Sequence, residues 1–432
     1  MTVATSTIVG ALACQKNSFL RTLNTNVVSS QEYIDPSAKK KAPRFYAIEL
    51  EDTVLFPEGG GQPYDTGIIS VNGDKTIQVH KVVRDKLKAL HLTLESIEPG
   101  TSVTLNVDWD RRIDLMQQHT GQHLLSAILD GYEIPTLSWA MGDMISYVEL
   151  PKRLEDSIVE EVSEKVNNAI LQQHPIKVVS NDEANDSDFD TSSIPTDYDK
   201  EKGVIRVIKI GDLDSNTCCG THLQNTGQIQ AISLLHQVNV RAGNSRLHFI
   251  CGSRVYKYLQ QLHSILKAAG SSLLCQLGEI NEKIDLLNVN YKKAMSRESA
   301  LLKQIAGGEA GRILKLFKDG KSFAFVYSKD ASPEYLTVCQ KELATLIKKC
   351  EPSSSEISIG QKQTVVYING DTGTGGMIKM EGPLVEEIKK QLDSTLKNLK
   401  GGGKGNSFQG KVVHYEKGEI QSVLRYFQEF NQ

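Results

Sequence analysis

The chain has 432 residues, 39% of them hydrophobic and 23% charged, and a formal net charge of −3. This length predicts two to three domains, and the composition is typical of a globular protein, which excludes wholesale disorder and a membrane class. The small net charge excludes a uniformly basic surface, but it allows a local group of cations that binds phosphates.

The cysteines indicate a reducing compartment. There are 7 of them, an odd number, and only Cys218 and Cys219 are adjacent, so they do not form the pattern of a disulfide framework. No Lys or Arg precedes Lys16, as a signal peptide would need, and no apolar run is long enough to span a bilayer. We therefore expect a cytoplasmic protein without a membrane segment.

Residues 1–105 are expected to form a small, β-rich, barrel-like domain. Short apolar stretches between turns predict strands, at residues 7–14, 45–50, 66–71 and 76–83. Between the second and third of these the chain reads Phe56-Pro57-Glu58-Gly59-Gly60-Gly61-Gln62-Pro63. Because glycine and proline disfavour helix and central strand, this segment is predicted to be a loop.

Residues 106–252 are expected to form an α+β domain. Asp108 and Asp110 are suitable caps for a helix whose apolar residues recur at helical spacing from Ile113 to Ile128. A second helix is predicted near 152–173, followed by strands, at 176–180, 204–210 and 228–235. The acidic stretch 182–201 is predicted to be a solvated loop.

The last 180 residues are expected to be helical and then α/β. Residues 253–306 are helical with a break at Gly270-Ser271-Ser272, and the apolar spacing after the break is that of a heptad seam. This pattern indicates a helical hairpin or a dimerising coiled coil. Residues 307–432 alternate strands and helices and predict an α/β domain, with strands at 323–327 and 364–369 and helices at 334–349, 383–399 and 418–430.

Two histidines are candidate metal ligands. His119 and His123 stand at positions i and i+4 of the predicted helix, so they project from one face and can share one metal ion. Two ordinary polar histidines would give the same spacing. A zinc protease would have Glu where this chain has Thr120, so that class of enzyme is disfavoured.

Cys218 and His222 form a second candidate pair. A thiolate and an imidazole four residues apart, in a turn that contains glycine, suit zinc. Buried structural cysteines are more common than cysteine ligands. The presence of both pairs in one predicted domain nevertheless favours a single site with four ligands.

Several motifs together resemble, in the same order, the editing region of alanyl-tRNA synthetase and its free-standing relatives, the AlaX editing proteins. They are residues 56–62, His119-x-x-x-His123, Val207-Ile208-Lys209-Ile210-Gly211-Asp212, Cys218-x-Gly220-Thr221-His222 and Thr226-Gly227. The later Gly401-Gly402-Gly403-Lys404-Gly405 resembles the glycine loop of the synthetase's C-terminal domain. The resemblance covers nearly the whole chain and indicates the long AlaX type.

This resemblance implies a hydrolase that protects translation fidelity by removing the wrong amino acid from tRNA(Ala), from Ser-tRNA(Ala) first and Gly-tRNA(Ala) second. It implies one Zn²⁺ held by the two ligand pairs, His119, His123, Cys218 and His222. Cys219 stands where the family has a glycine, so its thiol could compete, although the register favours Cys218. Because four protein ligands close a tetrahedral shell, the sequence leaves open whether zinc activates water or only positions the substrate.

The resemblance also implies roles for residues around the metal. Gln122, beside a ligand, is expected to position water or substrate, although a surface amide would have the same spacing. Gly60 and Gly61 are expected to let backbone N–H groups approach the tRNA end. Thr136 and Ser138 fall in the region that lines the amino-acid pocket in this family, where a hydroxyl favours serine over alanine.

The C-terminal part is expected to bind tRNA and to form a homodimer. Residues 389–411 contain six lysines and one acidic residue, and phosphate contacts by such lysines supply much of the affinity for a nucleic acid. Lys397, Lys400 and Lys404 are the expected contacts, although a solvated helix face has the same composition.

Two other classes of protein compete with this interpretation. A threonyl-tRNA editing domain has similar histidine and cysteine–histidine motifs, but it leaves the glycine loops near residues 60 and 403 unexplained. A zinc-stabilised RNA-binding module without catalysis would have a closed metal site and would unfold on chelation. A deacylation assay separates the enzymes from the binding module.

Overall fold

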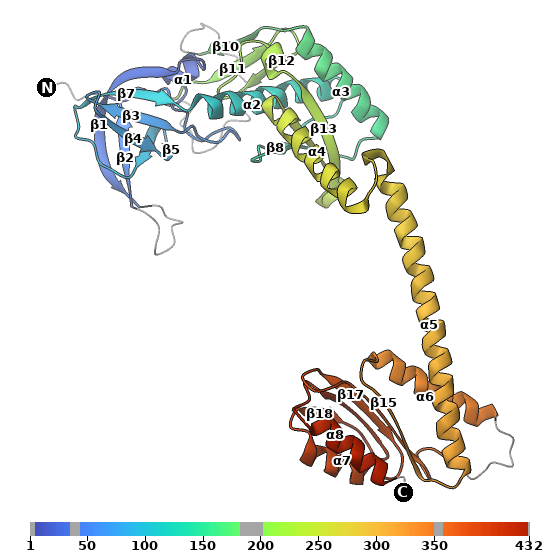
Figure 1. The fold of residues 1–432 in the computed structure, drawn as a ribbon. Helices are drawn as coiled ribbons and strands as arrows, with labels where there is room; N and C mark the ends of the chain where they lie inside the picture. Colours follow the sequence, from blue (N-terminus) through green and yellow to red (C-terminus); the bar gives the residue numbers. More distant parts are fainter. Residues whose placement is uncertain (1–4, 35–43, 182–201, 350–356, 431–432) are drawn as a thin grey trace. The chain divides into compact units, whose positions relative to one another are not determined.

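The computed structural model describes residues 5–34, 44–181, 202–349 and 357–430. The chain divides into two compact units, Met1–Ala268 and Ala269–Gln432, which are shown in Figure 1. The elements confirm the α+β class. The predicted acidic loop at 182–201 lies outside the described residues. No helix in the described part of the chain is long and apolar enough to span a membrane.

The first unit begins with an antiparallel sheet of seven strands in the order β4-β3-β7-β1-β2-β6-β5 (Figure 1). The strands are β1 (Thr22–Tyr33), β2 (Phe45–Leu50), β3 (Gly67–Val71), β4 (Lys75–Val79), β5 (Lys81–Asp85), β6 (Lys88–Thr93) and β7 (Ser102–Val107). This region is therefore rich in β-strands as expected, but the described residues show no closed barrel. β4 and β5 follow one another in the chain, yet each pairs at an opposite end of the sheet.

Two of the strands predicted in this region differ from the structure. Residues 7–14 pair with no strand in the described structure; they bury Val9 and Leu12 in the core of the sheet and lead into α1 (Ala13–Lys16). Their apolar character thus reflects burial without strand pairing. The strand expected at 76–83 is divided into β4 and β5 at His80.

Helix α2 (Trp109–Asp130) follows β7 directly and buries His119 and His123. Asp108 caps it as predicted, because its side chain accepts a hydrogen bond of 3.3 Å from the backbone N–H of Arg111. Arg112 ties the helix to the first sheet, since its buried guanidinium pairs with the buried carboxylate of Asp65 and donates to the carbonyl of Ser18.

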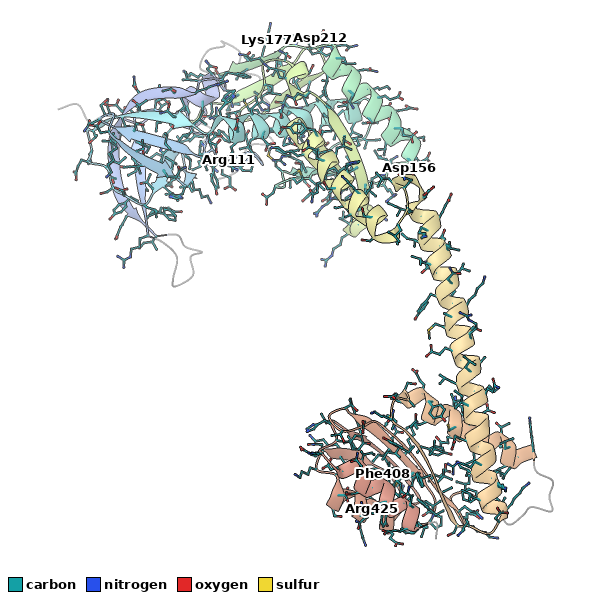
Figure 2. The ribbon with its side chains drawn as sticks, viewed as in Figure 1. Arg111, Asp156, Lys177, Asp212, Phe408 and Arg425 are labelled. Atoms are coloured by element: carbon teal, nitrogen blue, oxygen red, sulfur yellow. The ribbon has the colours of Figure 1, made fainter. Side chains whose placement is uncertain are left out.

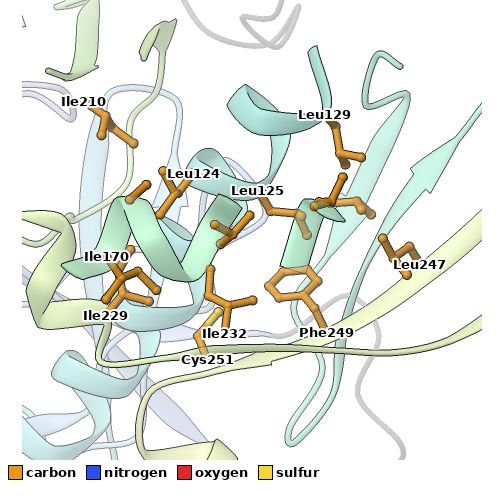
Figure 3. Close-up of a cluster of buried hydrophobic side chains, with 14 of the residues drawn as sticks. Leu124, Leu125, Leu129, Ile170, Ile210, Ile229, Ile232, Leu247, Phe249 and Cys251 are labelled. Carbon is orange, nitrogen blue, oxygen red and sulfur yellow. The ribbon is translucent and has the colours of Figure 1, made fainter. Parts of the chain in front are cut away.

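Helices α2 and α3 (Asp156–Leu171) pack over a sheet in the order β13-β14-β9-β8. Figure 3 shows this core, which includes Leu124 and Leu125 of α2 and Phe249 of β14. The four strands are β8 (Ser138–Ala140), β9 (Ser146–Leu150), β13 (Ile232–Asn239) and β14 (Ser245–Cys251). A smaller sheet holds β10 (Ile176–Ser180), β11 (Arg206–Ile210) and β12 (Asp214–Thr217). The strand expected from 228 begins at 232, because Thr226–Ile229 forms a 3-10 turn.

The helical region contains α4 (Ser253–Leu273) and α5 (Ile280–Lys318). The expected break at Gly270-Ser271-Ser272 lies a few residues later, after Leu273. The expected end at Gly307-Gly308 is wrong, because α5 continues through both glycines. A glycine inside a helix costs about 1 kcal/mol, which is offset here by the burial of Ala310 and Ile313 against α6 and the C-terminal sheet.

The C-terminal sheet has the order β15-β16-β17-β19-β18 and lies between two pairs of helices (Figure 1). Its strands are β15 (Phe323–Ser328), β16 (Thr364–Asn369), β17 (Gly376–Glu381), β18 (Leu399–Gly402) and β19 (Ser407–Val412). The end of α5 and α6 (Pro333–Lys349) cover one face, and α7 (Val385–Thr395) and α8 (Glu419–Glu429) cover the other. The expected glycine loop at 401–405 is partly strand, since Gly401 and Gly402 end β18.

Candidate metal centre and its pocket

Four side chains that can bind a metal converge in the first unit. The ligand atoms of His119, His123, Cys218 and His222 all lie within 4.8 Å of one another. The two histidines at i and i+4 come from α2, and the other two residues come from the turn after β12. The structure thus brings together the two pairs that the sequence spacing suggested.

The contacts define which atoms face the middle of the cluster. Nε2 of His119 lies 3.4 Å from Sγ of Cys218, and Nε2 of His222 lies 3.3 Å from the same sulfur. The ring of His119 also stacks on Trp139, with centroids 4.9 Å apart. One thiolate and three imidazoles are a donor set that suits zinc.

Each of the three histidines has a hydrogen-bond partner at Nδ1, which leaves Nε2 for the cluster. His119 contacts Oε1 of Gln62 at 2.8 Å, and His123 contacts Oδ2 of Asp214 at 3.2 Å. For His222 the contact is Oγ1 of Thr120, at 3.3 Å. Such outer partners fix the ring orientation of metal-binding histidines and increase their basicity, so the arrangement fits a metal ion.

The electrostatics of the metal-free cluster favour a thiolate at Cys218. Burial raises the pKa of this thiol, but the imidazoles of His119 and His222 outweigh burial and hold the pKa well below its ordinary value. Burial lowers the pKa of His123, but hydrogen bonds to Asp214 and Cys218 outweigh it and raise the pKa to about 10. Because a metal ion needs the neutral imidazole, metal binding competes with this proton.

Cys219 lies outside the four-residue cluster. Burial and the adjacent Cys218 raise the pKa of its thiol to about 12, which disfavours a thiolate ligand. Its sulfur packs against the glycine loop, where a Cβ atom on Gly60 would lie only 2.9 Å from it. The side chain that replaces the family's glycine therefore fills space beside the loop.

Arg206 and Gly220 hold the cysteine turn against α2. Arg206 is buried, and its guanidinium donates to the carbonyls of Cys219 and Gly220, at 2.6 and 2.9 Å. A Cβ atom on Gly220 would lie 2.3 Å from Cε1 of His119 and 2.7 Å from Oε1 of Gln62. Only glycine at this position lets the turn approach the histidine so closely.

A pocket of about 610 Å³ opens beside the cluster. His119, His123 and Cys218 contribute to its wall, and so do Gly60 and a short polar chain of side chains. Such a concave site with a few convergent polar groups is the usual form of a small-molecule site.

The polar chain runs along α2 into the pocket wall. Nε2 of Gln122 donates to Oγ of Ser126 at 2.9 Å, and Ser126 shares a hydrogen bond of 2.7 Å with Oγ1 of Thr136. Ser138 also lines the pocket, but it is exposed on β8. Thr136, rather than Ser138, is therefore held by a hydrogen bond within the wall.

The other predicted site residues lie apart from this chain of hydroxyls. Gly61, with a positive φ of 80°, lines a second pocket that it shares with Lys81 and Arg84. The expected tRNA contacts are exposed in the C-terminal unit, namely Lys397, Lys400 and Lys404.

Sequence reasoning missed several supporting side chains. Ser126 could have been found, because it lies four residues after Gln122 on the same helix face. Gln62 was inside the glycine motif, but nothing in the residue pattern linked it to a histidine. Asp212 and Asp214 both precede the cysteine turn in the sequence. Only the position of Asp214 at the start of β12 shows that it, and not Asp212, is the partner of His123.

Comparisons with known proteins identify similar chains among tRNA synthetases and tRNA editing proteins. The family model for the threonyl and alanyl tRNA synthetase second additional domain matches residues 205–248, which include the cysteine turn. The putative alanyl-tRNA editing protein alaX of Saccharomyces cerevisiae is 38% identical over 97% of this chain and 96% of its own. Alanyl-tRNA editing protein Aarsd1-B of Xenopus laevis is 32% identical over 96% of this chain and 97% of its own.

A synthetase is also similar to this chain, but over less than half of the synthetase's own length. The alanine–tRNA ligase of Pyrococcus abyssi is 31% identical over 91% of this chain, but the match covers 43% of the ligase. The chain therefore corresponds in extent to the free-standing editing proteins. From its end-to-end similarity to these relatives and the converging histidine and cysteine motifs, the chain belongs to the alanyl-tRNA editing protein family.

Proposed function

We propose that this protein hydrolyses the ester bond of tRNA(Ala) charged with the wrong amino acid, Ser-tRNA(Ala) first and Gly-tRNA(Ala) second, and that it uses zinc. The observation that carries the proposal is one pocket whose wall contains three of the four metal-binding side chains and the hydroxyl of Thr136. The names of the relatives, which are alanyl-tRNA editing proteins, support charged tRNA(Ala) as the substrate.

His119, His123, Cys218 and His222 would hold the metal. Zinc bound there would supply a Lewis acid that polarises an ester carbonyl and acidifies water. The side chains of this protein supply orientation: Asp214 and Thr120 hold the rings of His123 and His222.

Ser126 and Thr136 provide the basis for selecting serine. Gln122 donates to Ser126, so the hydroxyl of Thr136 has a fixed partner and keeps hydrogen-bonding capacity for a substrate. A serine side chain can use that capacity, whereas the methyl group of alanine leaves it unpaired. One additional hydrogen bond contributes about 0.5–1.5 kcal/mol, which corresponds to roughly 2- to 12-fold in rate.

The test is deacylation of tRNA(Ala) charged separately with serine, glycine and alanine. We expect serine to be removed fastest. Thr136→Val should reduce the preference for serine over alanine, and Ser138→Ala, the matched control in the same pocket, should leave it in place. Equal rates for serine and alanine in the parent protein would refute the selective pocket.

Two further outcomes would favour a different function. Faster hydrolysis of Ser-tRNA(Thr) than of Ser-tRNA(Ala) would favour a threonyl-type editing enzyme. Binding of tRNA by the zinc-loaded protein without cleavage of any substrate would favour a non-catalytic RNA-binding protein.

We also propose that Lys397, Lys400 and Lys404 contact tRNA phosphates. All three are exposed, and they lie on or beside the β18–β19 hairpin. Each phosphate contact that is lost reduces the dependence of log K on log salt by roughly 0.7–0.9. Alanine at all three positions should therefore lower both the affinity and this slope, while zinc content stays constant. An unchanged slope would remove these lysines from the interface.

The helix α5 is proposed as a dimer contact. Its side chains are drawn along its length in Figure 2. Ile284, Leu287 and Tyr291 are exposed in three-four steps, and Leu301 is exposed further along, after the interruption at Glu298. Sedimentation should give a dimer that Leu287→Glu converts to a monomer, whereas Lys293→Glu on the other helix face should not. A monomer at all concentrations of the parent protein would contradict this.

A further inference from the structure

Gln62, the last residue of the loop 59–62, connects the N-terminal sheet to the metal centre. Gly59 and Gln62 exchange two backbone hydrogen bonds, of 3.1 and 3.0 Å, so the loop is a closed turn. The side chain of Gln62 is fully buried and contacts residues from two other segments, His119 of α2 and Thr221 of the cysteine turn.

The backbone of Thr221 determines which end of the Gln62 amide faces His119. The N–H of Thr221 lies 3.0 Å from Oε1 of Gln62, and Nε2 of Gln62 lies 2.8 Å from Oγ1 of Thr221. A backbone N–H can only donate, so the amide atom that faces it must be the carbonyl oxygen. Reversing the amide would place two donors against each other.

That orientation in turn determines the tautomer of His119. Oε1 of Gln62 also lies 2.8 Å from Nδ1 of His119. Because this oxygen accepts only, Nδ1 must carry the proton and donate it. In the neutral ring, Nε2 then keeps its lone pair and faces Sγ of Cys218, 3.4 Å away.

We propose that Gln62 is a positioning residue for the metal centre: it holds His119 in the Nδ1–H form and presents Nε2 to the metal. The inference rests on the proposed zinc site. It gives the N-terminal sheet a part in the chemistry, because this sheet's loop supplies the outer partner of one ligand, whereas the partners of His123 and His222 come from β12 and from α2 itself.

The ring of His119 has little room to turn toward another partner. The ring of His119 is confined by Trp139, with centroids 4.9 Å apart, and by Gly220, where a Cβ atom would lie 2.4 Å from Nδ1. A ring that has lost its Gln62 acceptor therefore cannot turn toward a replacement partner without moving the cysteine turn.

The main experiment measures zinc affinity of the full chain by competition with a chelator, in the absence of tRNA. Gln62→Met has a similar length and no acceptor for Nδ1–H, and we expect it to bind zinc about 10- to 100-fold more weakly, the usual loss for an outer partner. Gln62→Glu restores an acceptor and should keep the affinity within about threefold of the parent.

Thr221→Val is the matched control. It removes the Oγ1 acceptor of Gln62 at equal size, but it keeps the backbone N–H that orients the amide. Its zinc affinity should fall much less than that of Gln62→Met, and Co²⁺ absorption spectra should show a changed ligand field only for Gln62→Met. Equal losses in Gln62→Met and Thr221→Val, with both proteins folded by circular dichroism, would overturn the inference.

A second measurement does not depend on any variant. Long-range ¹⁵N–¹H spectra of the histidine-labelled, zinc-loaded parent should show His119 protonated at Nδ1, with Nε2 as the metal-binding nitrogen. Protonation at Nε2 would overturn the inference directly. Neither readout involves tRNA, so a parent protein that fails to deacylate tRNA would leave both results unchanged. A parent protein that binds no zinc would refute the metal site itself.

Discussion

Lowering the pH should weaken the N-terminal sheet through one histidine, His91. This ring is fully buried on β6; Nδ1 lies 3.0 Å from the carbonyl oxygen of Ile48, and Nε2 lies 2.8 Å from the hydroxyl of Thr53. Since the carbonyl only accepts, Nδ1–H donates to it and Nε2 accepts from Thr53. Burial lowers the pKa of His91 from 6.5 to about 4, against a smaller opposing effect of the bond to Ile48.

The sign of the effect follows from this lowered pKa. Between pH 6.5 and about 4 the unfolded chain binds a proton at His91 that the folded protein excludes, so stability falls as the pH decreases through this interval. The stabilisation is fully present above pH 6.5. The difference in pKa corresponds to about 3 kcal/mol, lost by about pH 4.

The assay is urea unfolding followed by tryptophan fluorescence at several pH values. The chain contains 2 tryptophans, Trp109 and Trp139, and both report on the first unit. His91→Gln keeps a donor and an acceptor, and its stability should fall about 3 kcal/mol less than that of the parent between pH 7 and 4. His263→Gln, an exposed control on α4, should follow the parent. Identical pH profiles for the parent and His91→Gln would refute the reasoning.

Three further predictions concern the ion pair and the cysteine turn. Arg112→Met leaves the buried carboxylate of Asp65 without its cation, with the N–H of Phe56 still donating to it, and should lower the free energy of unfolding by about 3–5 kcal/mol, whereas Arg246→Met, in a half-exposed pair, should cost under about 1 kcal/mol in the same urea assay. Cys218→Ala should abolish zinc binding and Cys219→Ala should retain most of it, as measured by elemental analysis; the reverse result would assign the ligand to Cys219. Gly220→Ala should displace His119 and lower zinc affinity at least about tenfold; a normal affinity would show that the turn can move.

The parts of the fold that the sequence predicted best include short strands rich in β-branched residues and a helix start with a capping side chain. The strands at 176–180 and 364–369 agree with the structure to the residue, and Asp108 caps α2 as expected. Residues 7–14 were misjudged because an apolar run shows burial and not strand pairing. The helix through Gly307-Gly308 was missed because packing of neighbouring residues outweighed a weak local preference.

The same contrast applies to the site. His119 and His123 are linked by helical spacing, and Cys218 and His222 by a short turn, so a sequence suffices to suggest them. The partners of these residues come from distant segments: Gln62 lies 57 residues from His119, and Asp214 lies 91 residues from His123. No local sequence pattern links residues that are so far apart in the chain. Only the folded structure shows that Gln62 contacts His119 and that Asp214 contacts His123.

The separation of the ligands along the chain also sets the order in which the centre can assemble during synthesis. His119 and Cys218 are 99 residues apart, and at about 5–20 residues per second the ribosome needs roughly 5–20 s to make the intervening segment. Over that interval the nascent chain presents the helix histidines without their thiol. Acquisition of the proposed metal would therefore follow translation of residue 222, and a ribosome-bound chain that stops before residue 218 should be unable to retain zinc.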